Sequence, residues 1–437
     1  MSTLVVNGSD RRRSRTSVRP SAGDYSPQAP GRSSGANTPM PTRTCEDTAM
    51  APTIPYGPTG LGTAGLRITG TAPPGLALEE PESDGGDGDG DGEQHSGDAE
   101  VRPGEQRVRP IPGIHFRPAV QPDPALVAEV DRRTKLWALE LDLIPPEWED
   151  QFEGFGFGRS VCLAHPDHAD VERLVVAARL LVAENAVDDC YCEDHGGSPE
   201  GLGARLAIAH SALDPLHSTP VYEADWHDGM TADAPLRAYR SSMEHAVRWA
   251  APAQADRLRH DLARLHLGYL AEAAWSLDAV TPPVWEYLVM RQFNNFRPCL
   301  TLTDLVAGYE LPAPLQALAA VQRLTALAGN ASTLVNDLYS YTKEKRAERP
   351  HLNLPVVLAR RDSLPEREAF LKAVEIHNEI MHRFETESAQ LNELLPDPVL
   401  ARYLAGLAAW VSGNHEWHST NTHRYTLPDF WTQENAA

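Results

Sequence analysis

The sequence has few basic residues relative to acidic ones, few cysteines, and no long uninterrupted apolar segment. Lys and Arg number 39 against 61 Asp and Glu, which gives a formal net charge of −22. Because nucleic acids and anionic membranes attract basic surfaces, this deficit argues against both as partners. It does not argue against a phosphorylated small molecule, since bound divalent cations reverse the sign of a local electric field.

The cysteines are sparse, odd in number and contain no CxxC pair: Cys45, Cys162, Cys190, Cys192 and Cys299. Such a set favours free thiols in a reducing compartment over a disulfide framework. No apolar stretch approaches the ~18 residues that a membrane span requires. No apolar core follows the basic run Arg11–Arg13, so the N-terminus does not resemble a signal peptide. We therefore expect a cytoplasmic protein without a membrane segment.

The first part of the chain, residues 1–115, is rich in Pro, Gly, Ser, Thr and charge. It has too few bulky apolar residues to offset the entropy lost when a backbone is ordered. We predict that this segment is a disordered extension and that residues 116–437 form the folded domain.

After residue 115 the apolar residues recur at three- and four-residue steps, which is the spacing of helices with one buried face. No alternating β pattern and no repeat of 20–50 residues is present. The sequence therefore predicts an all-α bundle. Helices separated mostly by proline-containing joints are expected around residues 124–143, 167–194, 200–212, 234–250, 253–279, 284–307, 312–344, 365–394 and 397–420.

Acidic residues cluster where the apolar helix predicted over 167–194 ends, in the run Asp188-Asp189-Cys190-Tyr191-Cys192-Glu193-Asp194. Carboxylates at a helix C-terminus repel one another and the negative end of the helix dipole. On an α-helix Asp189 and Glu193 face the same way, with Asp188 about 100° to one side. Divalent cations would relieve the repulsion, and hard cations such as magnesium take oxygen ligands. The alternatives are a solvated acidic helix end and, less favoured, a zinc site at Cys190, Cys192 and His195.

A second polar group lies within the helix predicted over 312–344. Asn336, Ser340 and Glu344 are spaced four and four, so their oxygens line one helical face. Asn and Ser side chains compete with backbone hydrogen bonds and are therefore disfavoured inside a helix. The presence of both residues on one helical face favours a ligand-binding role for them. An amide, a hydroxyl and a carboxylate suit one divalent cation; the alternative is an ordinary polar stripe.

Together these clusters resemble the metal-binding motifs of bacterial class I terpene cyclases. The first is similar to their aspartate-rich motif in a D-D-x-x-x-E form, and the second to their N-D-x-x-S-x-x-K-E pattern. Arg291, which lies 45 residues before Asn336, resembles the diphosphate-sensing arginine of the family. The pair Arg424-Tyr425 near the C-terminus resembles the arginine and tyrosine that bind the diphosphate. The four signatures occur in the family's order and span the whole predicted domain.

The resemblance implies an α-helical bundle around a central active-site cavity and a reaction that ionises an allylic diphosphate with three Mg²⁺ ions. It implies metal ligands at Asp188, Asp189, Glu193, Asn336, Ser340 and Glu344. Diphosphate-binding residues would be Arg291, Lys343, Arg424 and Tyr425, and the residues most directly tied to catalysis Asp188, Asp189 and Arg291. A homodimer is expected by family.

The exact residues of the two motifs, together with the long acidic extension, indicate a resemblance to one group within the family. They are typical of members that convert 2-methylgeranyl diphosphate and water to a bicyclic eleven-carbon alcohol. The alternatives are a cyclase of the same fold acting on geranyl or farnesyl diphosphate and, from another class, a catalytically inactive helical scaffold. A chain-elongating prenyltransferase is disfavoured because it would carry a second aspartate-rich motif.

One departure from the family concerns the helix break after the sensor arginine, where many members have glycine. Here the segment reads Arg291-Gln292-Phe293-Asn294-Asn295. Asparagine tolerates the left-handed conformation better than most residues, so we expect the break to survive. Four aromatic residues on or near the motif helices are expected to pack in the core, with a pocket-lining role as the alternative: Phe293, Phe296, Trp410 and Trp417.

Overall fold

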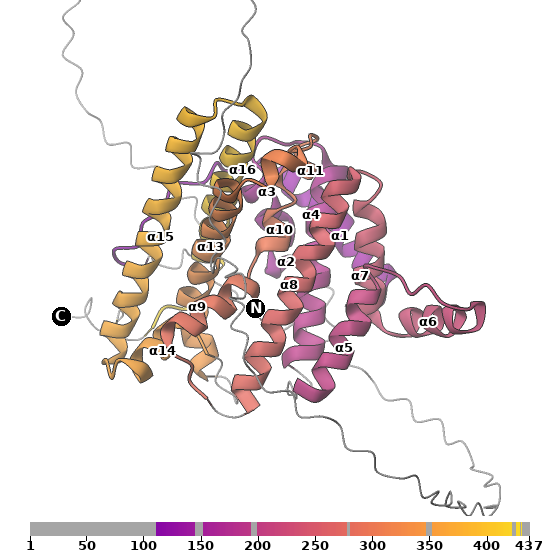
Figure 1. Ribbon diagram of the computed structural model, residues 1–437, viewed down its shortest axis with the longest axis horizontal. Helices are drawn as coiled ribbons and strands as arrows, with labels where there is room; N and C mark the ends of the chain where they lie inside the picture. Colours follow the sequence, from indigo (N-terminus) through magenta and orange to yellow (C-terminus); the bar gives the residue numbers. More distant parts are fainter. Residues whose placement is uncertain are drawn as a thin grey trace, which may run out of the picture. The chain divides into compact units, whose positions relative to one another are not determined.

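The structure, a computed structural model, describes residues 111–144, 152–193, 199–277, 280–346, 352–421, 425–428 and 430. These residues form helices joined by loops, and no strand occurs among them (Figure 1). The predicted all-α fold is therefore confirmed. Most of the extension predicted to be disordered, residues 1–110, lies outside the described ranges. The last residues before the predicted boundary are part of the helical core, since Ile111 and Ile114 are both buried.

Nine helices of thirteen residues or more are present in the described ranges: α1 (Pro124–Glu140), α4 (Val171–Val187), α5 (Pro199–Ser211), α6 (Pro220–Ala232), α7 (Ala234–Ala246), α8 (Pro252–Leu277), α13 (Ala319–Arg346), α15 (Glu366–Leu394) and α16 (Pro398–Thr420). Shorter helices join them: α2 (Phe152–Phe155), α3 (Phe157–Ala164), α9 (Val284–Phe293), α10 (Arg297–Leu300), α11 (Thr303–Val306), α12 (Ala313–Gln316) and α14 (Leu354–Arg361). Asp170 and Asp397 illustrate how the helices begin, because each side chain accepts a backbone N–H of the first turn.

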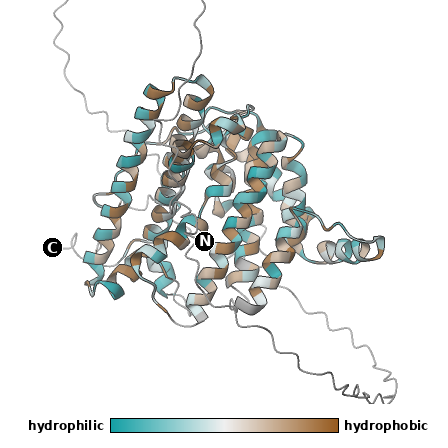
Figure 2. Cartoon of the chain, viewed as in Figure 1, coloured by the Kyte–Doolittle hydropathy of each residue, from teal (hydrophilic) through white to brown (hydrophobic). Residues whose placement is uncertain are grey.

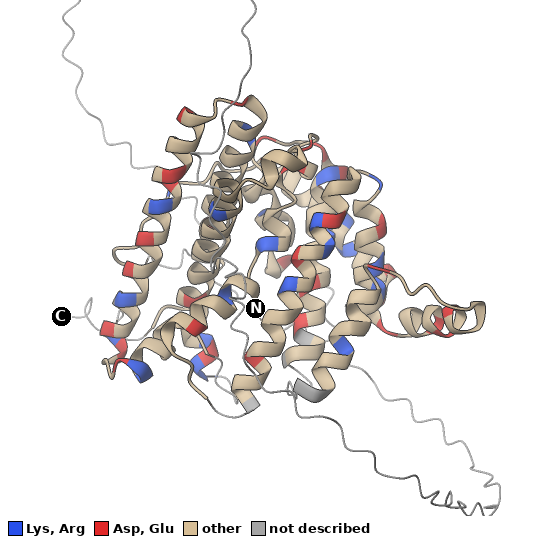
Figure 3. Cartoon of the chain, in the orientation of Figure 1, with Lys and Arg blue, Asp and Glu red and all other residues tan. Residues whose placement is uncertain are grey.

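Two long helices, α4 and α13, lead to or carry the predicted metal-binding motifs, and α16 packs beside them. Helix α13 contacts α15, α16, α14 and α9. Helix α16 also contacts α3, and α4 contacts α1, α3 and α7. The buried residues of α15 recur at helical spacing, as in Ala369, Phe370, Ala373, Val374 and His377. Figure 2 shows the corresponding alternation of apolar and polar residues along the helices, and Figure 3 shows charges of both signs interspersed along α15.

Some predicted helix boundaries were wrong. The helix predicted over 284–307 is three helices, α9, α10 and α11, because the chain leaves the helical conformation at Asn294. The helix predicted over 312–344 divides into α12 and α13. Helices α2, α3, α6 and α14 were not predicted; α2, α3 and α14 span only 4, 8 and 8 residues, and α6 is largely exposed. None of the described helices is long and apolar enough to cross a membrane.

Candidate active site

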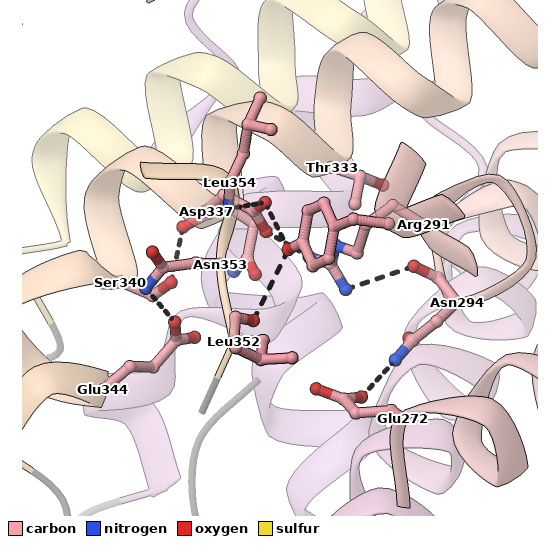
Figure 4. Close-up of polar contacts among 12 residues, drawn as sticks. Glu272, Arg291, Asn294, Thr333, Asp337, Ser340, Glu344, Leu352, Asn353 and Leu354 are labelled. Carbon is pink, nitrogen blue, oxygen red and sulfur yellow. Dashed lines mark hydrogen bonds and ion pairs between the residues drawn. The ribbon is translucent and has the colours of Figure 1, made fainter. Parts of the chain in front are cut away.

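Helix α13 places the three predicted ligands of its polar cluster along one face. Asn336 and Ser340 are buried and Glu344 is half-buried. The Ser340 hydroxyl donates to the Asn336 carbonyl oxygen at 2.7 Å, which leaves the lone pairs of Oγ available. The Glu344 carboxylate accepts a hydrogen bond from Asn353 Nδ2 at 2.9 Å (Figure 4). An amide, a hydroxyl and a carboxylate oxygen therefore follow one another along the helix, and this is a donor set that fits Mg²⁺.

His418 on α16 fixes the orientation of the Asn336 amide. Nδ1 of His418 lies 2.8 Å from the Asn414 carbonyl oxygen, which can only accept, so Nδ1 carries the proton. Nε2 of the neutral ring is then an acceptor for Asn336 Nδ2, which lies 3.2 Å away. This contact uses the amide nitrogen and leaves Asn336 Oδ1 for a cation.

The aspartate-rich cluster occupies a π-helical segment, Asp188–Glu193, that continues α4. The sequence predicted an α-helix here, and the wider turn is a feature often found at functional sites. The Asp188 side chain is buried. The side chains of Asp189 and Glu193 lie outside the described part of the structure, as does His195 of the zinc alternative.

A small pocket, with a cavity volume of about 20 Å³, lies between α4, α13 and α16. Its wall includes Asn336 of the α13 cluster and Tyr425 of the predicted arginine–tyrosine pair. The ring of Tyr425 stacks on His418 with centroids 5.2 Å apart, whereas Arg424 lies outside the described residues. The remaining lining residues come mainly from α3, α4 and α16: Phe157, Ser160, Leu181, Asn185, Phe296, Trp410, Asn414 and Trp417.

Three of the four aromatic residues considered from the sequence, Phe296, Trp410 and Trp417, therefore contribute to the pocket wall as well as to the core. Their rings offer apolar surface and negative π faces, which attract cations. Phe293 does not line the pocket; the Arg264 guanidinium lies over its ring at 4.5 Å. The pocket-lining alternative thus holds for three residues and fails for one.

Arg291 on α9 is held by the residue that follows Asn336. Its Nη2 lies 2.6 Å from Asp337 Oδ1, and its Nη1 donates to the Asn294 carbonyl oxygen at 3.2 Å. Asp337 Oδ2 accepts from the Tyr287 hydroxyl at 2.7 Å and the Leu354 amide at 2.9 Å (Figure 4). The buried Nε of Arg291 has no hydrogen-bond partner within the described ranges, so a diphosphate oxygen could accept from it.

The charges in this pair are stabilised by each other. Burial alone would lower the pKa of Arg291, but the adjacent Asp337 carboxylate, together with Tyr287 and Glu272, raises it above the ordinary arginine value. Burial raises the pKa of Asp337, and Arg291 opposes that shift with help from Tyr287 and Leu354. Lys343, the remaining diphosphate ligand predicted on α13, is half-buried.

The helix break after Arg291 is present, as predicted, but it does not use the left-handed conformation. Asn294 has φ −80° and ψ 83°. The backbone there approaches α8 so closely that a Cβ on Gly268 would lie 2.4 Å from the Asn294 nitrogen. Asn294 also donates to the Glu272 carboxylate at 2.6 Å. A glycine is thus required on the opposing helix, and not at the break.

Sequence reasoning missed the polar residues of α4 and α16 that surround the pocket. His418 and Asn414 are four residues apart on a helix that was predicted only from its apolar pattern. Asn185 and the buried Glu184 precede Asp188 of the aspartate-rich cluster by three and four residues. Polar side chains at helical spacing on an apolar helix were the available signal.

Comparisons with known proteins agree with this geometry. The sequence profile described as terpene synthase family 2, C-terminal metal binding, matches residues 179–383. The chain is 58% identical to the 2-methylisoborneol synthase of Streptomyces griseus, over 86% of this chain and 80% of that protein. It is 33% identical to a (+)-T-muurolol synthase of Streptomyces clavuligerus that cyclises farnesyl diphosphate, but over only 53% of this chain.

Solved structures give the same result. The fold is similar to that of 2-methylisoborneol synthase from Streptomyces coelicolor in complex with Mg²⁺ and 2-fluoroneryl diphosphate. The TM-score is 0.72 at 60% identity, with 74% of this chain and 99% of that chain covered. The family predicted from the motifs is confirmed, and the chain belongs to the 2-methylisoborneol synthases within terpene synthase family 2.

Proposed function

We propose that the protein converts 2-methylgeranyl diphosphate and water to 2-methylisoborneol and diphosphate in the presence of Mg²⁺. The observation that carries this proposal is one pocket where Asn336, Tyr425 and the helix leading to Asp188 meet. The aromatic and apolar wall suits a hydrocarbon chain, and the polar residues at one end suit a diphosphate. The identity to 2-methylisoborneol synthases supports the methylated substrate over geranyl and farnesyl diphosphate.

The oxygen-bearing residues of the two motifs would hold three Mg²⁺ ions: Asp188, Asp189 and Glu193 on one side, and Asn336, Ser340 and Glu344 on the other. When bound, these ions supply positive charge where negative charge develops on the departing diphosphate. Arg291, Lys343, Arg424 and Tyr425 bind the diphosphate oxygens and orient carbon 1 of the substrate toward the pocket. The aromatic rings then exclude bulk water and stabilise the carbocation during ring closure.

The test is product analysis with purified protein, Mg²⁺ and, separately, geranyl, 2-methylgeranyl and farnesyl diphosphate. We expect 2-methylisoborneol from the methylated substrate and its loss in Asn336→Ala, with Asn392→Ala on α15 as a control that makes the same change outside this pocket. Turnover of farnesyl diphosphate alone would leave a terpene cyclase with another substrate. No turnover, and no thermal stabilisation by Mg²⁺ with inorganic diphosphate, would favour the inactive scaffold.

We also propose that the extension is dispensable for catalysis. The helical core begins by Ile111, which is buried, so a chain starting at residue 111 retains all the described contacts. Its kcat should match that of the full chain, and loss of turnover in a folded truncated protein would contradict the proposal. The family resemblance further supports a cytoplasmic homodimer, which light scattering during gel filtration and cell fractionation would test.

A further inference from the structure

We propose that Asn414 positions the water molecule whose oxygen becomes the hydroxyl group of the product. This inference rests on the proposed function, because it concerns its last step. The product is a tertiary alcohol, so a carbocation must be captured by water. The competing outcome is loss of a proton, which gives a hydrocarbon. A pocket that excludes bulk water therefore needs one place where a single water is held.

Asn414 offers such a place. Its side chain lines the pocket, is only 5% exposed, and has an Oδ1 atom with no hydrogen-bond partner within the described ranges. A buried oxygen without a donor is energetically unfavourable, and an ordered water is the usual solution in a polar site. Asn185 and Ser160 line the same pocket and provide the further polar groups that an ordered water needs. Asn185 Nδ2 already donates to the Leu181 carbonyl oxygen at 2.7 Å, so its Oδ1 is the part of the amide left to contact water.

The position along the helices also fits the chemistry. Asn414 precedes His418 by one helical turn, and His418 contacts the predicted metal ligand Asn336. Asn185 precedes Asp188 by three residues on the facing helix α4. Both amides thus lie roughly 5 Å along their helices from the polar end of the pocket. In 2-methylisoborneol the hydroxyl group is on the carbon that was carbon 2 of the substrate, next to the carbon that lost the diphosphate. The capturing water must therefore lie near this end.

An amide suits this role because it accepts a hydrogen bond without acting as a base. A carboxylate or a free imidazole in its place could remove a proton from the cation and divert the reaction to an alkene. In the capture step a lone pair of the water oxygen forms the C–O bond to carbon 2. The proton released from that oxygen passes to the diphosphate that the ionisation step has already produced. Asn414 therefore gains and loses no proton.

The experiment compares the wild type with Asn414→Leu, which is similar in volume but has no acceptor. The assay uses 2-methylgeranyl diphosphate and Mg²⁺, and measures diphosphate release and the ratio of alcohol to hydrocarbon products. We expect the ratio to fall about fivefold or more, the factor expected from one lost hydrogen bond, while diphosphate release continues. Ser412→Ala, on the same helix but lining a different pocket, should leave the ratio unchanged.

An unchanged product ratio in Asn414→Leu would overturn the inference. If that variant does not fold, the smaller Asn414→Val decides in the same way. Absence of diphosphate release from the wild type would instead contradict the proposed function, so the two failures are distinguishable. Melting temperatures of all variants show whether a change in ratio accompanies a loss of structure.

Discussion

His418 and Asn336, which are 82 residues apart in the sequence, are joined by a hydrogen bond of 3.2 Å between Nε2 and Nδ2. The bond places a ring nitrogen of α16 behind the amide that α13 presents to the pocket. Because His418 is fully buried and its other nitrogen faces a carbonyl oxygen, the ring has one orientation and one neutral form. The position of a predicted metal ligand thus depends on a residue near the C-terminus.

His418→Phe should weaken the response to Mg²⁺ while leaving the fold intact. The phenyl ring fills the space but accepts no hydrogen bond, so the Asn336 amide loses its fixed orientation. Loss of such a supporting partner typically costs ~10–100-fold in metal affinity or activity. The measurements are the Mg²⁺ concentration for half-maximal rate and the thermal stabilisation by Mg²⁺ with inorganic diphosphate. His377→Phe, at another buried histidine, is the control. Equal behaviour of the two variants would contradict the assigned role.

Asp337→Asn should destabilise the protein because it leaves the buried Arg291 charge without its ion partner. Removing one member of a buried pair costs on the order of 3 kcal/mol. Combining it with Arg291→Met removes both charges, so the double variant should lose less stability than the sum of the two single variants. Urea denaturation of all four proteins gives the coupling free energy. Simple additivity would show that the 2.6 Å contact between the two side chains carries little energy.

Gly268→Ala should perturb the helix break that Arg291 contacts. The new Cβ would lie 2.4 Å from the Asn294 nitrogen, so α8 and the break must separate. We expect a loss of about 1–3 kcal/mol in unfolding free energy and a lower kcat. Gly229→Ala on α6 is the matched control, because nothing lies within 4 Å of its added Cβ. A variant as stable and active as the wild type would show that the close approach is readily relaxed.

Glu184→Gln should flatten the dependence of stability on pH. Burial raises the pKa of Glu184 to about 8, above the ordinary glutamate value of 4.5. The folded protein therefore favours the protonated acid, and this contribution is complete below pH 4.5 and lost progressively as the pH rises to 8. The glutamine variant keeps a neutral group and should be more stable than the wild type at pH 8. Chemical denaturation at pH 5 and 8 measures the difference. The exposed Glu375→Gln should show the wild-type slope, and the same slope in Glu184→Gln would disprove the assignment.

The sequence was most informative where one helix carries the whole pattern. Asn336, Ser340 and Glu344 share a face because four-residue spacing on an α-helix requires it, and the structure shows the helix. The pocket wall was less predictable, because Asn185 comes from α4, Asn414 from α16 and Phe296 from the break before α10, and they meet only through tertiary packing. The same holds for Gly268, whose importance depends on how closely another segment approaches it.

The break at Asn294 shows that apolar periodicity does not reveal where a helix ends. The apolar pattern continues through 284–307, so periodicity alone predicts one helix. Where α9 ends, the Asn294 backbone lies against Gly268 of α8 and the Asn294 side chain donates to Glu272, and neither contact is visible in the apolar pattern. The resemblance to the family identified the position, since it directed attention to the residues after Arg291.

The π-helical segment Asp188–Glu193 contains one residue more per turn than an α-helix would. Such a turn can be gained or lost by inserting or deleting a single residue, with the rest of α4 still packed as before. A deletion would rotate the residues beyond it by about 100° about the helix axis. The direction of the acidic side chains could therefore change between related enzymes through single-residue length differences, without any substitution in the hydrophobic core.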